Sequence, residues 1–386
     1  MRDVAIVGYG ETRIDVATGR NSYDLAGDVL DQVLSKYELD RTDIDGLSVS
    51  ETMSETANPF WAQYMADALG LSATWLEVVG LGGVSSIGSV ARAAMAIRMG
   101  MCTTALVLAS DAQSSGKTPE QGAQRFEFQY PTGLRGPVGA FGMIMRRYDH
   151  LYGLDRRALA KLAVTQREHG MLNPNSCPKL RKPITESDYL NSKLVSDPLR
   201  VLDSVMVCDG ANAILLTSRE NAERRGMKAI YPTAYEELSG FNVDQPMAEI
   251  LESGFQKAGP RALARAGMKA SDIQSFHPYD DFLIAIMLQL EQIGFCEAGK
   301  GADFILNTDM SIRGTLPLNT GGGQISAGQP GLAGGGVNLV EAVRQMFGEA
   351  GSRQISNIEN AMVTGIGGIH YARNWCTSGV LILEQG

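Results

Sequence analysis

Two stretches of this sequence share one layout: Asp40-Arg41-Thr42-Asp43-Ile44-Asp45-Gly46-Leu47-Ser48-Val49-Ser50 and Met268-Lys269-Ala270-Ser271-Asp272-Ile273-Gln274-Ser275-Phe276-His277. Each follows a long amphipathic helical pattern. Each then passes through an Asp-Ile pair into a short apolar segment of the kind that forms a buried strand. The sequence therefore predicts that a helix–strand unit of the first half occurs again in the second half.

The match continues further along the chain. Each copy is followed by glycines, a helical pattern and an apolar segment, at Gly82-Gly83, Ser89–Met99 and Ala105–Ser110 in the first half and at Gly334–Gly336, Val337–Phe347 and Ala361–Gly365 in the second. Because the order is the same in both halves, we expect two stacked copies of one α/β unit. The predicted halves are residues 1–225 and 226–386.

Outside these copies, strands and helical patterns also alternate, which is typical of α/β proteins. Further strands are predicted at Val4–Gly8, Ala213–Thr217 and Gly379–Leu383, and further helices at Ser22–Tyr37, Ala158–Glu168, Met247–Ala266 and Phe282–Ile293. Residues from about 112 to 201 interrupt the repeat. They look loop-rich with one clear helix, so we expect a lid or substrate domain over the core.

Length and charge restrict the function classes. The chain has 386 residues, which is long enough for an enzyme, and 34 Lys and Arg against 43 Asp and Glu give a net charge of −9. There is no basic stripe interleaved with aromatic residues, so nucleic-acid binding is not expected. No apolar run approaches the ~20 residues that a membrane span needs, so we expect no membrane insertion.

The five Cys and four His are scattered, without a C-x-x-C pair. We therefore expect neither a disulfide framework nor a metal site. The first residues, Met1-Arg2-Asp3-Val4-Ala5-Ile6-Val7-Gly8, have the pattern of a strand and not of a secretory signal, which favours a cytoplasmic location. Glycine is the outlier, with 44 residues gathered in clusters that indicate sharp turns or close backbone contacts.

Three landmarks carry a resemblance to a known family. They are Tyr279-Asp280-Asp281-Phe282, the run from Asn319-Thr320-Gly321-Gly322-Gly323-Gln324 to Gly328-Gln329-Pro330, and Gly365-Ile366-Gly367-Gly368. With the two halves and the insertion, the chain resembles the thiolase superfamily, in its branch of sterol-carrier-protein-like thiolases, often labelled lipid-transfer proteins. The resemblance implies a thiolase fold, in which two duplicated α/β halves form a five-layered core with an inserted loop domain.

The positions at which thiolases carry thiol and imidazole groups hold other residues here. The nucleophilic cysteine of the family falls on Val84, its His-Asp-Cys-Phe is Tyr279-Asp280-Asp281-Phe282, and its Gly-His-Pro is Gly328-Gln329-Pro330. No thiol stands near Gly365, where many thiolases carry a second cysteine. Valine cannot be acylated, so thiolysis by the ordinary covalent route is not expected.

Other residues do not replace the missing nucleophile. Cys102, Cys208 and Cys296 stand in apolar settings that are typical of inert core thiols. Ser85 and Ser86 lie beside Val84, but no general base is visibly paired with them, and a serine at a helix start is commonly an N-cap.

The residues that remain resemble those of the thiolase-fold aldolases of steroid side-chain degradation. Those enzymes carry tyrosines at the Tyr-Asp landmark and after the last glycine loop, and Tyr279 and Tyr371 match these positions. The resemblance implies retro-aldol cleavage of a β-hydroxyacyl-CoA with a steroid-like or aromatic acyl chain. The reaction needs no covalent cysteine and no bound cofactor, because coenzyme A is part of the substrate.

On this interpretation Tyr279 and Tyr371 transfer protons, with Asp280 and His370 as further catalytic candidates. The enolate would be held by Asn319 or Gln329 and by the backbone around Gly83, with Val84 and Gly367 lining the same place. Which tyrosine is the acid and which is the base stays open. Structural roles are the alternatives: core tyrosines, a helix N-cap at Asp280 and a packing histidine at His370.

Two other functions remain as alternatives. The chain could be a divergent thiolase or acyltransferase that cleaves a β-ketoacyl-CoA, or a non-catalytic acyl-CoA-binding subunit. The resemblance also implies partners, because proteins of this branch often pair with a small subunit made of a zinc ribbon and an OB-fold. A homodimer is expected as well, since the outer strand of such a core pairs across a two-fold axis.

Overall fold

The nine-stranded sheet of this protein contains one four-strand order twice, and the edge strand β3 extends the first copy. The computed structural model describes residues 2–55, 58–116, 131, 133–134, 136–245, 249–369 and 373–386. The strand order is β3-β2-β4-β7-β1 in the first half, continued by β8-β11-β10-β9 in the second. The strands are β1 (Val4–Glu11), β2 (Gly46–Ser50), β3 (Trp75–Val79), β4 (Thr104–Asp111), β7 (Gly210–Ser218), β8 (Ile230–Ser239), β9 (Phe276–His277), β10 (Asn360–Ile369) and β11 (Trp375–Gln385).

The pairing directions repeat together with the order. In the first half β2 pairs parallel with β4, which pairs antiparallel with β7, which pairs antiparallel with β1. In the second half β9, β10, β11 and β8 pair in the same three ways. The halves meet where β1 and β8 share a single register pair, Ile6 with Ile230. The predicted duplication is therefore confirmed.

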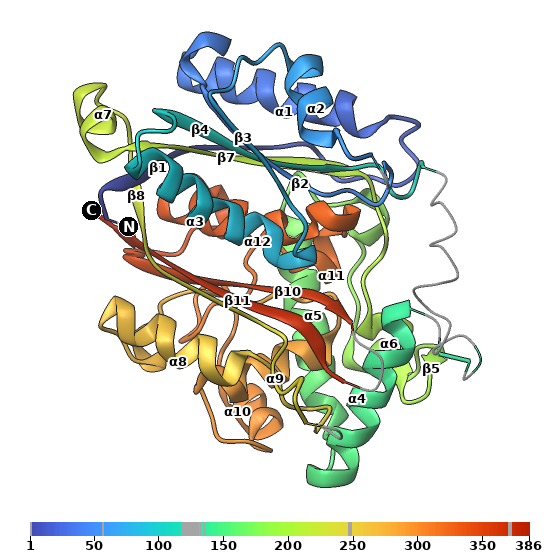
Figure 1. Ribbon diagram of the computed structural model, residues 1–386. Helices are drawn as coiled ribbons and strands as arrows, with labels where there is room; N and C mark the ends of the chain where they lie inside the picture. The colour runs from blue at the N-terminus through green and yellow to red at the C-terminus, as the bar shows by residue number, and fades with distance from the viewer. Residues whose placement is uncertain are drawn as a thin grey trace.

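Helices separate and cover the two halves of the sheet, which gives the five layers expected (Figure 1). The buried helices α3 (Ser85–Arg98) and α12 (Gly334–Met346) lie between the two halves and contact each other. The outer layers contain α1 (Ser22–Tyr37) and α2 (Trp61–Leu69) on one side, and α8 (Phe255–Ala266), α9 (Leu283–Ile293) and α10 (Gly301–Asn307) on the other. The short helix α7 (Arg219–Arg224) follows β7.

The repeated Asp-Ile pair has a local physical reason. In each copy the aspartate ends a 3-10 turn, and its carboxylate accepts a hydrogen bond from the backbone N–H three residues earlier. The Asp43 carboxylate accepts from the Asp40 amide at 2.9 Å, and the Asp272 carboxylate accepts from the Lys269 amide at 2.8 Å. The isoleucine that follows is buried in both copies. The turn therefore directs the chain from the helix layer into the sheet.

The insertion between β4 and β7 is more helical than we predicted. In place of one helix it contains α4 (Gly136–Tyr152), α5 (Arg156–Leu172) and the short α6 (Glu186–Leu190), followed by the hairpin β5 (Leu194–Ser196) and β6 (Leu199–Arg200). The pattern hid α4 because glycines weaken its helical signal. Gly142 has a packing reason, since a Cβ there would lie 2.6 Å from the Ser196 hydroxyl.

Two other predicted elements differ from the structure, and two strands were not predicted. The helix predicted from Met247 begins only at Phe255, because Gly254 packs tightly against the Leu238 carbonyl; residues 246–248 lie outside the described part of the chain. The strand predicted from Ile273 is limited to β9. Strands β3 and β8 were not predicted, since charged or polar side chains interrupt their apolar pattern. Among the described residues, no helix is long and apolar enough to cross a membrane.

Candidate active site

Tyr279 stands between β9 and α9, where the backbone is held on both sides. Its N–H donates to the Thr364 hydroxyl at 2.9 Å, and its carbonyl accepts from the Gln289 amide at 2.8 Å. The aromatic ring lies directly on the backbone of Gly83 at the start of α3: a Cβ on Gly83 would overlap the ring and lie 2.6 Å from the hydroxyl. The fold therefore brings Tyr279 to the helix start at which the family's nucleophile stands.

Two glutamine side chains surround the phenol. The Gln329 amide donates to the Tyr279 hydroxyl at 3.4 Å and to the Gln324 side-chain oxygen at 3.3 Å. The Gln324 amide nitrogen is buried and has no hydrogen-bond partner among the described residues. Burial raises the pKa of the Tyr279 phenol well above its usual value, and the negative charge of Asp281 adds to this rise. The phenol is therefore protonated at neutral pH.

Asp280 holds the next segment of the site through its carboxylate. Its buried carboxylate accepts from the backbone amides of Gln324 at 2.9 Å and Ile325 at 3.2 Å, and from the Asn338 side chain at 3.0 Å. These donors lie at the start of α11 (Gly323–Ala327) and in α12. Burial raises the pKa of Asp280 to about 6, although the hydrogen bonds oppose the rise. In this geometry Asp280 fixes α11 against the tyrosine loop.

The glycine clusters are explained by backbone contacts around the same helix start. A Cβ on Gly365 would lie 2.7 Å from the Gly83 carbonyl oxygen, and a Cβ on Gly335 would overlap that oxygen. A Cβ on Gly367 would likewise overlap the Leu81 carbonyl. Larger residues would push these segments apart, so glycine is required for backbone donors and acceptors to converge at one place.

Val84 does not face the phenol. Its side chain is fully buried, packs against Gly379 of β11 and belongs to the core between the sheet halves. Burial raises the pKa of the Cys102 and Cys296 thiols to about 12, and it also raises the pKa of Cys208 and Cys376. A thiol that stays protonated is a poor nucleophile.

Asn319 is buried, and its predicted role at the enolate stays a prediction. It has a positive φ of 44°, and its side-chain amide donates to Gln166 at 2.8 Å and to the Pro278 carbonyl at 3.1 Å. It thereby supports the segment that leads into Tyr279. His370 and Tyr371 lie outside the described residues, so their predicted roles stay predictions.

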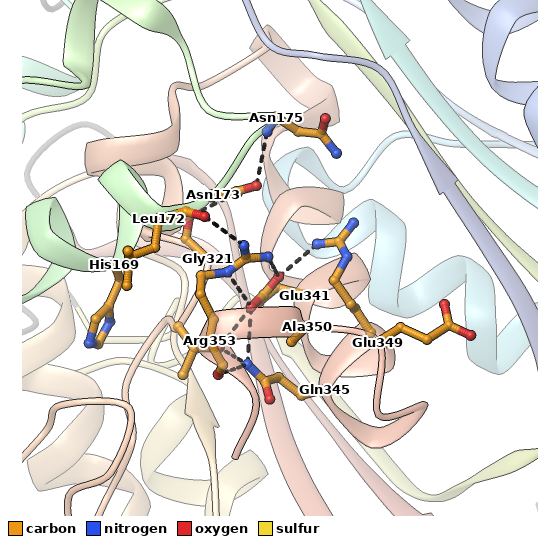
Figure 2. A network of polar contacts seen from close by, with 12 residues as sticks. His169, Leu172, Asn173, Asn175, Gly321, Glu341, Gln345, Glu349, Ala350 and Arg353 are labelled. Carbon is orange, nitrogen blue, oxygen red and sulfur yellow. Dashed lines mark hydrogen bonds and ion pairs between the residues drawn. The ribbon is translucent and has the colours of Figure 1, made fainter.

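A buried ionic cluster anchors the loop that contains Asn319 (Figure 2). The Glu341 carboxylate of α12 accepts from Arg353 at 3.0 Å, from Arg344 at 2.6 Å and from the Thr320 hydroxyl at 3.0 Å. Figure 2 shows this carboxylate between Arg353 and Gln345. Burial alone would raise the pKa of Glu341, but the two arginine charges outweigh burial and lower the pKa to about 2. The charge state of this cluster therefore does not change near neutral pH.

Four residues of the site were not predicted as functional: Asp281, Gln289, Gln324 and Thr364. Gln289 lies 10 residues from Tyr279 along the chain, and Thr364 lies 85 residues from it. The two side chains are hydrogen-bonded to each other and to the Tyr279 backbone. A glutamine and a threonine at these positions give no sign of function when only the sequence is known. Gln324 and Asp281 belong to the landmark motifs of the sequence. The replacement of the family's cysteine by Asp281 was the one signal that could have identified a functional residue.

Replacing Gly83 with alanine is expected to lower turnover about 10²-fold, because the new Cβ displaces the Tyr279 ring from its position. Steady-state kinetics on the purified variant measures the change. Gly27→Ala is the matched control, because a Cβ there meets no atom within 4 Å and it lies in α1. Full activity of Gly83→Ala would show that the ring position does not matter for the reaction.

Comparison with known proteins gives a consistent picture. The family profile described as thiolase C-terminal domain-like matches residues 241–384. The chain is 30% identical over 389 residues to the 17-hydroxy-3-oxo-4-pregnene-20-carboxyl-CoA lyase of Mycobacterium tuberculosis, covering 95% of this chain and 96% of that protein. It is also 30% identical over 390 residues to the steroid side-chain-cleaving aldolase of Thermomonospora curvata, covering 95% of both proteins.

A solved structure agrees over the whole chain. The structure titled "Ltp2-ChsH2(DUF35) aldolase" is similar with a TM-score of 0.86 and 29% sequence identity, covering 100% of this chain and 98% of that one. The similarity therefore includes the insertion as well as the duplicated core.

Proposed function

We propose that this chain, which belongs to the sterol-carrier-protein-like branch of the thiolase superfamily, is a carbon–carbon lyase that cleaves a β-hydroxyacyl-CoA by a retro-aldol reaction. One observation carries the proposal: the ring of Tyr279, whose buried phenol has a raised pKa, lies on Gly83 at the glycine-lined start of α3, where Val84 replaces the family's cysteine. Relatives that span nearly the whole chain are named as a lyase and an aldolase.

The reaction needs two proton transfers and a site for negative charge. A base removes the proton of the β-hydroxyl, the Cα–Cβ bond breaks to give a carbonyl product, and the electrons remain on the thioester as an enolate. Tyr279 suits the role of proton donor to the enolate carbon, because burial keeps its phenol neutral. The Gln329 and Gln324 amides beside its hydroxyl are suited to hold the enolate oxygen. Asp280 and Asn319 then position these groups.

The substrate proposed is a CoA thioester with a steroid-like or aromatic acyl chain and a tertiary β-hydroxyl. The steroid part rests on the names of the two relatives. To test it, the protein is incubated with such a thioester, and the ketone or aldehyde and the shortened acyl-CoA are measured by mass spectrometry. Cleavage without added CoA supports the lyase. Cleavage only of a β-ketoacyl-CoA and only with free CoA would instead identify a thiolase, and no turnover of either would contradict an enzymatic role.

We further propose that the chain works with a small DUF35 partner, expected from the sequence to consist of a zinc ribbon and an OB-fold. The similar solved structure carries the name of such a partner in its title. The assay above is therefore run with and without the partner, and the partner is expected to raise turnover. The cytoplasmic location stays a prediction.

The homodimer is proposed to form through β3. This strand is at the edge of the sheet, and exposed apolar side chains surround it, with Val78 40% and Met95 55% exposed. An edge strand of this kind pairs readily with a second copy.

Val78→Asp is expected to convert a dimer into a monomer, because it brings like charges together at the paired edge. Light scattering after size-exclusion chromatography measures the mass. Val201→Asp, at an equally exposed valine of the insertion, is the control and should leave the mass unchanged. An unchanged mass for both variants would place the interface elsewhere.

A further inference from the structure

Asp281 has no structural role of the kind that its neighbour Asp280 fills. It follows Tyr279 by two residues, and its backbone carbonyl accepts from the Val205 amide at 3.2 Å. The next residue, Phe282, pairs with Ser204 in an isolated bridge and stacks on Phe141 with ring centroids 4.1 Å apart. The backbone of Asp281 is therefore held firmly, whereas one of its carboxylate oxygens has no hydrogen-bond partner among the described residues.

The carboxylate of Asp281 has an unsatisfied oxygen. Its Oδ1 is buried and accepts no hydrogen bond from any described residue, although the residue as a whole remains partly open to solvent. A buried carboxylate oxygen without a donor costs stability, and such groups are found at sites of function. Asp280, one residue earlier, accepts from three donors. The two neighbouring carboxylates therefore differ in how far their hydrogen-bonding capacity is satisfied.

The charges around Asp281 all oppose its ionisation. The described charged group that acts on it is Asp280, and no lysine or arginine offsets that charge. Tyr279 is the other titratable neighbour. Among the nearby charges, that of Asp281 raises the pKa of the Tyr279 phenol the most, so the two groups lie close in space. Burial, together with Asp280, raises the pKa of Asp281 to about 8. With this pKa the carboxyl is largely protonated at pH 7 and largely ionised above pH 8, and its ionised form is a stronger base than an ordinary carboxylate.

We propose that Asp281 is a catalytic residue, the general base that accepts the proton of the substrate's β-hydroxyl. This inference rests on the lyase function proposed above. Asp281 stands at the cysteine position of the family's His-Asp-Cys-Phe pattern, so a group of thiolase chemistry is replaced by a base that suits aldol chemistry.

The proton balance closes within the Asp281–Tyr279 pair. The Asp281 carboxylate takes the hydroxyl proton, the O–H electrons form the new C=O bond, and the Cα–Cβ electrons move into the thioester enolate. The Tyr279 phenol protonates Cα, which releases the shortened acyl-CoA. The proton on Asp281 then returns to the phenolate, directly or through water, and both groups regain their starting states without another reactant.

The principal test compares Asp281→Asn with the wild-type protein and its partner on a β-hydroxyacyl-CoA. We expect kcat to fall at least about 10²-fold, since the amide keeps the shape but cannot accept the proton. In Asp281→Gly, added formate is expected to restore part of the turnover. Asp280→Asn serves as the control: it should lose activity through displacement of α11, and formate should not restore it.

A second readout does not depend on activity. Because the pKa of Asp281 is raised on folding, its favourable contribution is present below the unfolded value near 3.8 and is lost as pH rises through about 8. The melting temperature of Asp281→Asn relative to wild type is therefore expected to rise between pH 5 and pH 9. Wild-type turnover for Asp281→Asn, or lost turnover with a lowered melting temperature and no response of Asp281→Gly to formate, would overturn the proposal. Absence of cleavage by the wild-type complex would instead contradict the lyase function.

Discussion

Tyr279→Phe is expected to lower kcat for cleavage of a β-hydroxyacyl-CoA by about 10²–10⁴-fold, the usual contribution of a positioned acid or base. The ring would stay on Gly83, because the substitution removes only the hydroxyl. The Gln329 and Gln324 amides would lose their shared neighbour but keep their contact with each other. Substrate binding should therefore change little, and the loss should appear in kcat rather than in KM.

The matched control for this prediction is Tyr231→Phe. Tyr231 and Tyr279 are both 6% exposed, but Tyr231 lies in β8 and packs under Arg219. Both variants should unfold within a few degrees of the wild type. If Tyr279→Phe retained wild-type kcat while cleavage itself was confirmed, the phenol would have no part in proton transfer and its role would be packing.

Glu341→Gln is expected to lower the free energy of unfolding by about 3–5 kcal/mol, the effect of removing one partner of a buried ion pair. The carboxylate is 3% exposed and holds Arg344, Arg353 and the Thr320 hydroxyl. Arg344 would keep its pair with Glu11, but Arg353 would keep only the Leu172 carbonyl. Urea denaturation at pH 7 measures the change. Glu223→Gln, which breaks a surface pair with Arg219, should cost less than about 0.5 kcal/mol.

The Glu341 carboxylate also makes the free energy of unfolding depend on pH in the acidic range. Its pKa is lowered on folding from 4.5 to about 2, so its contribution is present above the unfolded value and is lost as pH falls from about 4.5 to 2. The shift corresponds to roughly 3 kcal/mol. The wild type should thus lose stability over this range more steeply than Glu341→Gln. Parallel pH profiles for the two proteins would show that the charge of Glu341 does not stabilise the fold.

The prediction of the fold from sequence succeeded where a local signal sets the structure. The Asp-Ile pairs at Asp43 and Asp272 cap a turn through contacts three residues apart, so their repetition is visible in the chain itself. It failed for α4, where Gly142 is needed against Ser196, a residue more than fifty positions away. Edge strand β3 was missed for a related reason, since Glu77 interrupts its apolar pattern.

The sequence by itself determined the duplicated α/β fold and indicated that the ordinary covalent route of thiolases is lost, because the valine at position 84 cannot be acylated. Only the tertiary structure decided how the remaining polar residues divide their tasks. Asp280 and Asp281 are neighbours of the same type, yet one carboxylate is met by three donors and the other leaves an oxygen unpaired. Hydrogen-bond partners and burial set the proton affinity of a carboxylate, and both come from segments that are distant in sequence.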